Sequence, residues 1–197
     1  MPENESGGGF WRRAYEFLRR PSARYSLAGL VLVGFIAGII FWGGFHTAIE
    51  MTNSLAFCTS CHEMQDTVFQ EYKETIHYKN RVGVRAICTD CHVPREWLPK
   101  MKVKILATFE LWGKLTGDID TKEKFEAKRL ELAQTVWGRM RATDSRECRN
   151  CHSFAAMDLS QQEKLAQKRH NEEELRKSGK SCIDCHQGIA HHMPKEG

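Results

Sequence analysis

Cys58-Thr-Ser-Cys61-His62 is the first of four C-x-x-C-H units in this chain, and these units determine its fold. The other three are Cys88-Thr-Asp-Cys91-His92, Cys148-Arg-Asn-Cys151-His152 and Cys182-Ile-Asp-Cys185-His186. All eight cysteines of the chain lie in these units. Two thiols with two residues between them add to the two vinyl groups of one haem, and the histidine that follows binds its iron. The sequence therefore predicts four covalently bound haem c groups, with the motif histidines as iron ligands.

Two other uses of paired cysteines fit the pattern less well. C-x-x-C pairs also build four-cysteine zinc sites, and cysteines in oxidising compartments form disulfide frameworks. Neither use explains the histidine that follows every pair. Histidine is 9 of 197 residues, so finding it after all four pairs by chance has a probability on the order of 10⁻⁵ to 10⁻⁶.

The spacing of the units suggests an internal repeat. They begin at residues 58, 88, 148 and 182, which gives intervals of 30, 60 and 34 residues. This two-plus-two pattern predicts one dihaem module at 47–95, a second at 142–197, and interfacial and bridging helices within 96–141. Because about 150 residues must enclose four macrocycles, we expect the haems to form much of the apolar core. The expected fold is mostly α with irregular loops.

A single apolar stretch precedes the motifs. Residues 27–45 read LAGLVLVGFIAGIIFWGGF and contain no charged side chain. As a helix they span roughly 28 Å, the thickness of a bilayer core, whereas the apolar region of a cleaved signal peptide has about 7–15 residues. We therefore predict one transmembrane anchor at 26–46. The pattern Gly34-x-x-x-Gly38 within it is a weak indication of a homodimer.

The charges around this stretch predict its orientation. Arginines 12, 13, 19, 20 and 24 precede the span, and the first basic residue after it is Lys73. Positive charge favours the cytoplasmic side, so residues 1–25 are expected in the cytoplasm and 47–197 in the periplasm of a bacterial inner membrane. The net charge of +4 and the lack of a basic block with interleaved aromatics argue against nucleic-acid binding.

Electron-transfer haems commonly use a second axial ligand, and five histidines lie outside the motifs. His77 lies 11 residues before Cys88 and His170 lies 12 residues before Cys182, so the repeat singles out both as distal ligands. We expect His77 in a helix at 64–78 and His170 in a helix at 159–176. His191 is favoured as a third ligand, with His192 as the alternative. The first haem is left short of a histidine, and Met64, two residues past its motif, is an alternative ligand from spacing alone.

At this point the chain resembles a known family. It combines one N-terminal span, a first motif extended to C-x-x-C-H-x-M, three further motifs, and the strings FWGGF, CHEM, QEY, VRAICTDCHVP, ECRNCH and CIDCHQGIAH. It is similar from about Arg19 to Pro194 to the NapC/NirT family of membrane-anchored tetrahaem quinol dehydrogenases. This resemblance implies that the protein oxidises menaquinol or ubiquinol and passes electrons to a periplasmic terminal reductase or its dihaem cytochrome subunit, most of all that of periplasmic nitrate reduction.

The resemblance also implies site residues. In the family the first haem is ligated by the methionine of the extended motif, here Met64, which leaves His62 doubtful as a ligand. Many relatives have a histidine three residues after the second motif, where this chain has Arg95. A family lysine near the quinol matches Lys104, and Glu110 is the nearest carboxylate to the family's acidic position. Both lie in a helix expected at 99–114. This helix has an apolar stripe beside its lysines, and it is either a solvated basic helix or a helix that lies in the membrane interface.

A further helix is expected at 123–141, with Asp120 and Glu123 resembling a capping box. Two other functions remain open at the sequence level. One is a conduit without its own quinol site, and the other is a multihaem reductase of a small nitrogen oxide, which needs an open iron facing a substrate pocket.

Overall fold

The computed structural model describes residues 8–19 and 24–195, and these residues form helices and irregular segments without any strand. The expected mostly α fold is confirmed. The chain divides into two compact units, Met1–Glu50 and Met51–Gly197. Arg20 and residues 1–7 of the predicted cytoplasmic segment lie outside the described residues.

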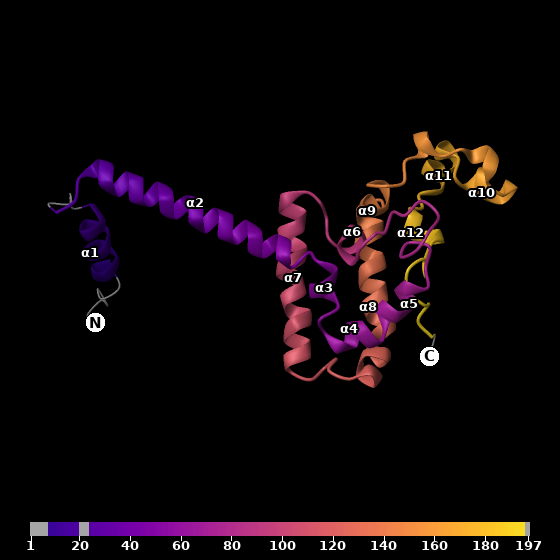
Figure 1. The fold of residues 1–197 in the computed structure, drawn as a ribbon, viewed down its shortest axis with the longest axis horizontal. Helices are drawn as coiled ribbons and strands as arrows, with labels where there is room; N and C mark the ends of the chain where they lie inside the picture. The colour runs from indigo at the N-terminus through magenta and orange to yellow at the C-terminus, as the bar shows by residue number, and fades with distance from the viewer. Residues whose placement is uncertain (1–7, 20–23, 196–197) are drawn as a thin grey trace, which may run out of the picture. The chain divides into compact units, whose positions relative to one another are not determined.

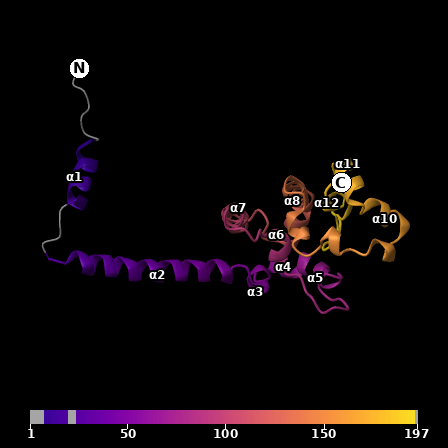
Figure 2. The ribbon, with the colours of Figure 1, turned by 90° about the horizontal axis from the view of Figure 1, so that it is seen from above.

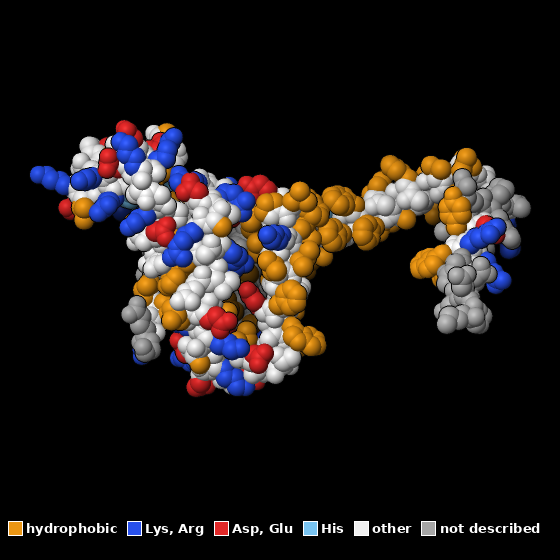
Figure 3. Space-filling model, turned by 180° about the vertical axis from the view of Figure 1, so that it is seen from behind, with side chains coloured by type: hydrophobic (Ala, Val, Ile, Leu, Met, Phe, Trp, Pro, Cys, Tyr) orange, Lys and Arg blue, Asp and Glu red, His pale blue; other side chains and the backbone are white. Residues whose placement is uncertain are grey.

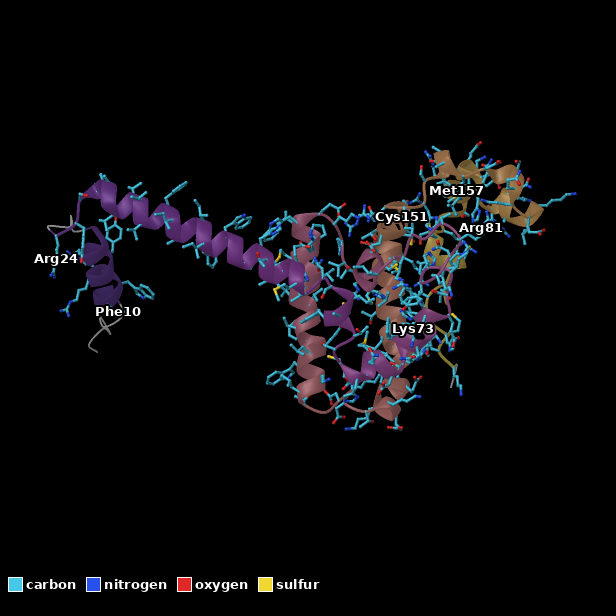
Figure 4. The ribbon with its side chains drawn as sticks, viewed as in Figure 1. Phe10, Arg24, Lys73, Arg81, Cys151 and Met157 are labelled. Carbon is cyan, nitrogen blue, oxygen red and sulfur yellow. The ribbon has the colours of Figure 1, made fainter. Side chains whose placement is uncertain are left out.

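The first unit contains α1 (Gly8–Arg19) and α2 (Leu27–Met51). Ser26 directly precedes α2, and its Oγ accepts a hydrogen bond from Gly29 N at 3.1 Å. It is the one helix of the described residues that is long and apolar enough to cross a membrane, which fits the predicted anchor. It continues six residues beyond the apolar stretch, to Met51. The helix α1 was not expected from the sequence. It carries an ion pair between Arg12 and Glu16 at 3.1 Å. Figure 4 labels Phe10 on this helix.

In the second unit, two long antiparallel helices flank the short helices of the first two motifs (Figures 1 and 2). They are α7 (Trp97–Leu115) and α8 (Lys122–Ala142), close to the expected ranges. The N-cap of α8 is Thr121, whose side chain accepts from Lys124 N, so the capping role expected for Asp120 is wrong. Asp120 instead pairs with Lys124 Nζ at 2.7 Å.

Short helices carry the motifs. They are α3 (Leu55–Cys58), α4 (His62–Asp66), α6 (Cys88–His92), α9 (Arg146–Arg149) and α12 (Cys182–Cys185). The second and fourth motifs share one local device: Asp90 accepts from Ile87 N and Asp184 from Ser181 N, each at 2.8 Å. A carboxylate at the third helical position that binds the preceding backbone N–H fixes the start of the helix.

The helix expected at 64–78 is interrupted. The chain forms α4, leaves helical geometry at Thr67 (φ −119°, ψ −98°), and resumes as α5 (Val68–Lys73). The Thr67 hydroxyl donates to the Glu63 carbonyl, a side-chain bond that competes with regular helix. His77 therefore lies in a turn after α5 and not in a helix.

The helix expected at 159–176 is also interrupted. The chain forms the 3₁₀ turns Phe154–Ala156 and Leu159–Gln161, then α10 (Lys164–Arg169) and α11 (Glu172–Ser178). Asn171 caps α11 by accepting from Glu173 N and Glu174 N at 3.0 and 3.2 Å. Asparagine followed by acidic residues is a helix-start signal, and it separates α11 from His170 at the end of α10.

The apolar core formed by side chains is small. Among the described residues only Tyr72, Phe125 and Ile183 are buried hydrophobics. Many large apolar side chains are exposed, and on α7 they form a face that Figure 3 shows as a hydrophobic surface. A unit of this length normally buries far more apolar surface, so the second unit has the composition expected of a shell around apolar groups.

Candidate haem-binding site

Histidine rings meet in three pairs within the second unit. The ring centroids lie 6.1 Å apart for His77 and His152, 6.2 Å for His92 and His191, and 5.9 Å for His170 and His186. Each pair joins one motif histidine to one of the three spare histidines that the spacing singled out. The structure thus places each of these three distal candidates opposite the histidine of one motif.

The pair distances test whether an iron fits between the rings. A metal–nitrogen bond is about 2 Å, and the nitrogen lies about 1 Å from the ring centre, so two imidazoles on one iron have centroids roughly 6 Å apart. All three measured distances match this value. The neighbouring cysteines and the small side-chain core complete the fit, and the residues present suit covalently attached haem.

Two of the distal histidines are oriented through Nδ1. His170 Nδ1 lies 2.6 Å from Gln162 Oε1, and His191 Nδ1 lies 3.2 Å from the Val68 carbonyl oxygen. A partner that holds Nδ1–H fixes the tautomer and leaves Nε2 as the metal-binding nitrogen. These contacts therefore prepare both rings for coordination.

The third distal histidine is held through the backbone. The Tyr72 hydroxyl lies within hydrogen-bond distance of the His77 and Ala86 carbonyls, and Ala86 N donates to His77 O at 3.1 Å. Burial raises the pKa of Tyr72 to about 12, so the phenol stays a donor. The loop that carries His77 is thus closed by a buried tyrosine.

Burial keeps three of the paired rings, His77, His92 and His191, in the neutral form that binds metal. It lowers the pKa of His92 to about 4, with a smaller contribution from His191. Burial also lowers the pKa of His77 and of His191. A neutral imidazole offers a free lone pair, which is the form that coordinates iron.

Two of the three pairs connect the two halves of the sequence. His77, from the first predicted module, faces His152 of the third motif, and His191, from the second, faces His92 of the second motif. Only His170 faces a histidine of its own module, His186. The spacing singled out these spare histidines, but the spatial pairing differs from a simple repeat with each ligand inside its own module.

The cysteines show which motifs are neighbours. Cys58 lies close enough to Cys88 for the two thiols to shift each other's pKa, and Cys148 lies equally near Cys182 in this sense. The helix α6 contacts α3 on one side and α9 on the other. Figure 4 labels Cys151, which follows α9 near the C-terminal end of α8. The four motifs therefore lie in the order in which they occur in the sequence.

The first motif has surroundings unlike the others. Met64 lines an apolar cavity together with Cys58, Cys88, Cys91, His92 and His191. The His62 side chain is 62% exposed, and its Nε2 lies 3.2 Å from Oε1 of the buried Glu63. His62 is in none of the three ring pairs, so the first motif is the one where a sulfur ligand is available and a histidine partner is not in place.

Glu63 is a buried carboxylate that the sequence analysis did not single out. It is 4% exposed, and its Oε2 accepts a hydrogen bond from Lys114 Nζ at 2.9 Å. Burial alone would raise the pKa of Glu63, but the hydrogen bond from Lys114, a backbone hydrogen bond and the nearby charges of Lys114 and His62 together hold the pKa below its ordinary value. Its Oε1 has no partner with hydrogen-bond geometry among the described residues. The string CHEM contained this residue, but only the fold shows that Lys114 meets it.

The two residues expected near the quinol lie on α7. Lys104 Nζ donates to Thr52 Oγ1 at 2.6 Å. It also lies near Cys58, whose pKa is lowered chiefly by Cys88 and to a smaller extent by the charge of Lys104. Glu110 is exposed one helical turn before Lys114. Arg95, where many relatives have histidine, lies 4.0 Å from Asp90 of the second motif. The structure thus brings Lys104 and Lys114 to the first motif, and leaves Glu110 on the outer part of the same helix.

Comparison with known proteins agrees with this site. The model of the NapC/NirT cytochrome c family, N-terminal region, matches residues 20–196. The chain is 62% identical to the denitrification system component NirT of Stutzerimonas stutzeri, covering 90% of this chain and 88% of that protein. It is 51% identical to the cytochrome c-type protein NapC of Escherichia coli K12, covering 98% and 96%.

A third relative is described by its haem content. The chain is 52% identical to a putative tetraheme cytochrome-c type protein of Allochromatium vinosum, over 88% of this chain and 92% of that protein. No solved structure matches the chain. The family model and the relatives cover nearly the whole sequence, including the anchor and all four motifs. The chain belongs to the NapC/NirT cytochrome c family.

Proposed function

We propose that this protein is a quinol dehydrogenase that carries four haems and delivers electrons to the periplasmic nitrate reductase system. As a family member it is a membrane-anchored cytochrome c with covalently bound haem c that transfers electrons to periplasmic reductases. The observation that carries the finer proposal is the set of three imidazole pairs about 6 Å apart beside a first motif without one. Haem supplies one-electron redox chemistry when it is bound.

The proposal assigns a role to each motif. The cysteine pairs 58/61, 88/91, 148/151 and 182/185 hold the four haems. The pairs His92 with His191, His152 with His77, and His186 with His170 would hold the irons of three of them. Met64 serves the first, and Glu63 holds His62 beside it. Since the histidines of the other three motifs each face a second histidine, the first motif is the one at which an external molecule would react.

The quinol side is proposed at the first motif. Quinol oxidation releases two electrons and two protons, so the site needs hydrogen-bonding and charged groups. Lys104 and Lys114 approach from α7, and the buried Glu63 carboxylate, which Lys114 holds through Oε2, offers an acceptor for a quinol hydroxyl. Lys104 and Glu110 remain the proposed groups that hold and pass protons. Menaquinol and ubiquinol both fit these requirements.

The helix α7 is proposed to lie in the membrane interface. Its outer face exposes Trp97, Leu98, Ile105, Phe109, Trp112 and Leu115. The hydrogen bond from Lys104 reaches Thr52, the residue that follows α2 in the chain. An amphipathic helix tied to the end of an anchor is well placed to meet lipid and to admit a lipid-soluble substrate. The haem unit is proposed to be periplasmic, with residues 1–25 in the cytoplasm.

The test is anaerobic addition of a menaquinol analogue to the detergent-solubilised full chain, with the haem absorption bands followed in a stopped-flow instrument. We expect rapid reduction that a quinone-site inhibitor blocks. Lys104→Met and Glu63→Gln are expected to slow it at least tenfold, while Lys102→Met, an exposed lysine of the same helix, leaves it unchanged. Failure of quinol to reduce a protein that dithionite reduces fully would favour a conduit without a quinol site. Consumption of nitrite by the reduced protein alone would favour a reductase.

A further inference from the structure

The segment after the fourth motif is held by two side chains from distant parts of the sequence. His192 N donates to Glu71 Oε2 at 2.9 Å, and Arg129 Nη1 donates to His192 O at 3.3 Å. Glu71 lies on α5 and Arg129 on α8. The backbone N–H and the carbonyl of His192 are therefore held by one acidic and one basic side chain.

The acid and the base also hold each other. Arg129 donates to Glu71 through Nη1 at 3.0 Å and through Nη2 at 2.5 Å. Glu126 Oε1 accepts a further bond from Nη2 at 3.1 Å. The Arg129 and Glu71 side chains are only 11% and 13% exposed. We call this pair the Arg129–Glu71 clamp. A planar guanidinium in a bidentate pair gives a fixed geometry that a flexible surface ion pair lacks.

The clamp grips the residue next to the proposed ligand. His191 directs its ring toward the Val68 carbonyl and His92, whereas the His192 ring is 68% exposed, near Glu71 and Glu74. The two neighbouring rings thus face different surroundings, so fixing the backbone of residue 192 decides which ring turns inward. Gly188, with φ +77°, begins the turn that brings this segment back over α5, and a side chain there would crowd Met193 at 3.2 Å.

We propose that the Arg129–Glu71 clamp is a positioning device that sets the register of the C-terminal segment and so selects His191 over His192 as the axial ligand of the second haem. The proposal rests on the ligand assignment made under the proposed function. It explains how two adjacent histidines, five and six residues after His186, come to have different roles.

The experiment uses the full haem-loaded chain. Arg129→Met removes the guanidinium with little loss of side-chain volume, and Glu71→Gln removes the charge but keeps an acceptor. Each variant is examined by low-temperature electron paramagnetic resonance and by spectropotentiometric titration. We expect the low-spin signal of one bis-histidine haem to be lost or shifted with a changed midpoint potential, while the other haems keep theirs. Arg129→Lys is expected to restore part of the signal.

The matched control is the exposed pair of Arg176 and Glu172, which is also an arginine–carboxylate contact, at 2.9 Å. Arg176→Met is expected to leave every signal unchanged. In the Arg129→Met background, adding His192→Ala is expected to cause a further spectral change, because the released segment then lets either ring approach iron. His192→Ala in the otherwise native chain is expected to change nothing.

The outcomes separate the clamp from the ligand assignment. Unchanged signals and potentials in Arg129→Met and Glu71→Gln proteins that hold four haems would overturn the clamp. If His191→Ala removes one low-spin signal in the same series, the ligand assignment survives that result. If His191→Ala also changes nothing, the assignment of His191 fails and the clamp proposal fails with it. Should Arg129→Met not accumulate, Glu71→Gln carries the test.

Discussion

In a histidine that binds a metal, the second ring nitrogen faces away from the metal. The hydrogen-bond partner of that nitrogen controls how basic the imidazole is as a ligand. Gln162 holds His170 Nδ1 at 2.6 Å, so Gln162→Leu removes the acceptor that makes this imidazole more electron-donating. Loss of such an outer contact typically weakens metal binding about 10- to 100-fold. We expect the midpoint potential of one haem to rise. Spectropotentiometric titration measures it, with Gln161→Leu at the neighbouring exposed glutamine as the control. Identical potentials in the two variants would contradict the orienting role.

The acid sensitivity of the protein is a second prediction at the level of one residue. Burial alone would raise the pKa of Glu71, but the hydrogen bonds from Arg129 and from the His192 backbone, with the nearby positive charge, together hold the pKa below its ordinary value of 4.5. A carboxyl group with a lowered pKa in the folded state stabilises that state above the unfolded pKa, and this stability is lost as the pH falls through the folded pKa. The charged groups facing Glu71 are Arg129, Glu126 and His192.

We therefore expect the free energy of unfolding to fall as the pH drops below about 4.5. Glu71→Gln is expected to make this pH dependence weaker. At neutral pH Arg129→Met is expected to cost about 3–5 kcal/mol, since it leaves a buried carboxylate without its partner. Denaturant unfolding at a series of pH values measures both effects. Equal acid slopes in the native chain and Glu71→Gln would show that other carboxyl groups cause the loss.

Residue identities were predictable where the chemistry is local in sequence. A C-x-x-C-H unit contains all the groups that attach one haem, so the eight cysteines and their histidines could be read directly. Glu63 and Lys114 could not, because they are 51 residues apart and only the packing of α7 brings them together. The Arg129–Glu71 clamp, 58 residues apart, was missed for the same reason.

At the level of elements, the apolar face of α7 gives a testable expectation. Phe109 and Trp112 are 70% and 65% exposed, so replacing both with glutamate removes no buried contact and should leave the fold intact. A charge in the interfacial region opposes insertion. We expect Phe109→Glu/Trp112→Glu to reduce cross-linking of α7 to photoactivatable lipids in nanodiscs several-fold. Thr135→Glu, on the exposed side of α8, is the control. Undiminished cross-linking would argue that α7 faces water or another protein.

Helices were predictable to different degrees for physical reasons. The ranges of α7 and α8 followed from a long apolar period, which tolerates small errors at the ends. The stretches 64–78 and 159–176 were broken by local polar groups that a periodicity argument weighs too lightly: Thr67 bonds back to Glu63, and Asn171 caps a new helix. The second break was visible in the sequence as Asn-Glu-Glu-Glu.

Asn171→Ala is expected to destabilise α11 by about 1 kcal/mol, measurable as faster amide exchange at Glu173 and Glu174.

At the scale of the whole molecule, the ring pairs oppose a division into two independent halves. His191 meets His92 and His77 meets His152, so each half of the chain supplies a histidine that faces a motif histidine of the other half. The spacing of 30, 60 and 34 residues indicates a repeat along the chain but carries no information on which ring faces which motif. Spatial order came instead from contacts of α6 with both α3 and α9.

This pairing predicts where an interruption falls in the path of electrons. If His191 serves the second motif and His170 the fourth, then removing one ring interrupts electron transfer near the quinol side, and removing the other interrupts it at the far end. We expect His191→Ala to allow rapid quinol reduction of only the first haem, with the other three reduced slowly. His170→Ala is expected to allow rapid reduction of three haems and to slow only the last. Stopped-flow spectra at matched quinol concentration give these amplitudes, with His192→Ala as the unaffected control. If His191→Ala instead behaves like His170→Ala, the exposed C-terminal segment serves the far end of the chain, and the crossed pairing is wrong.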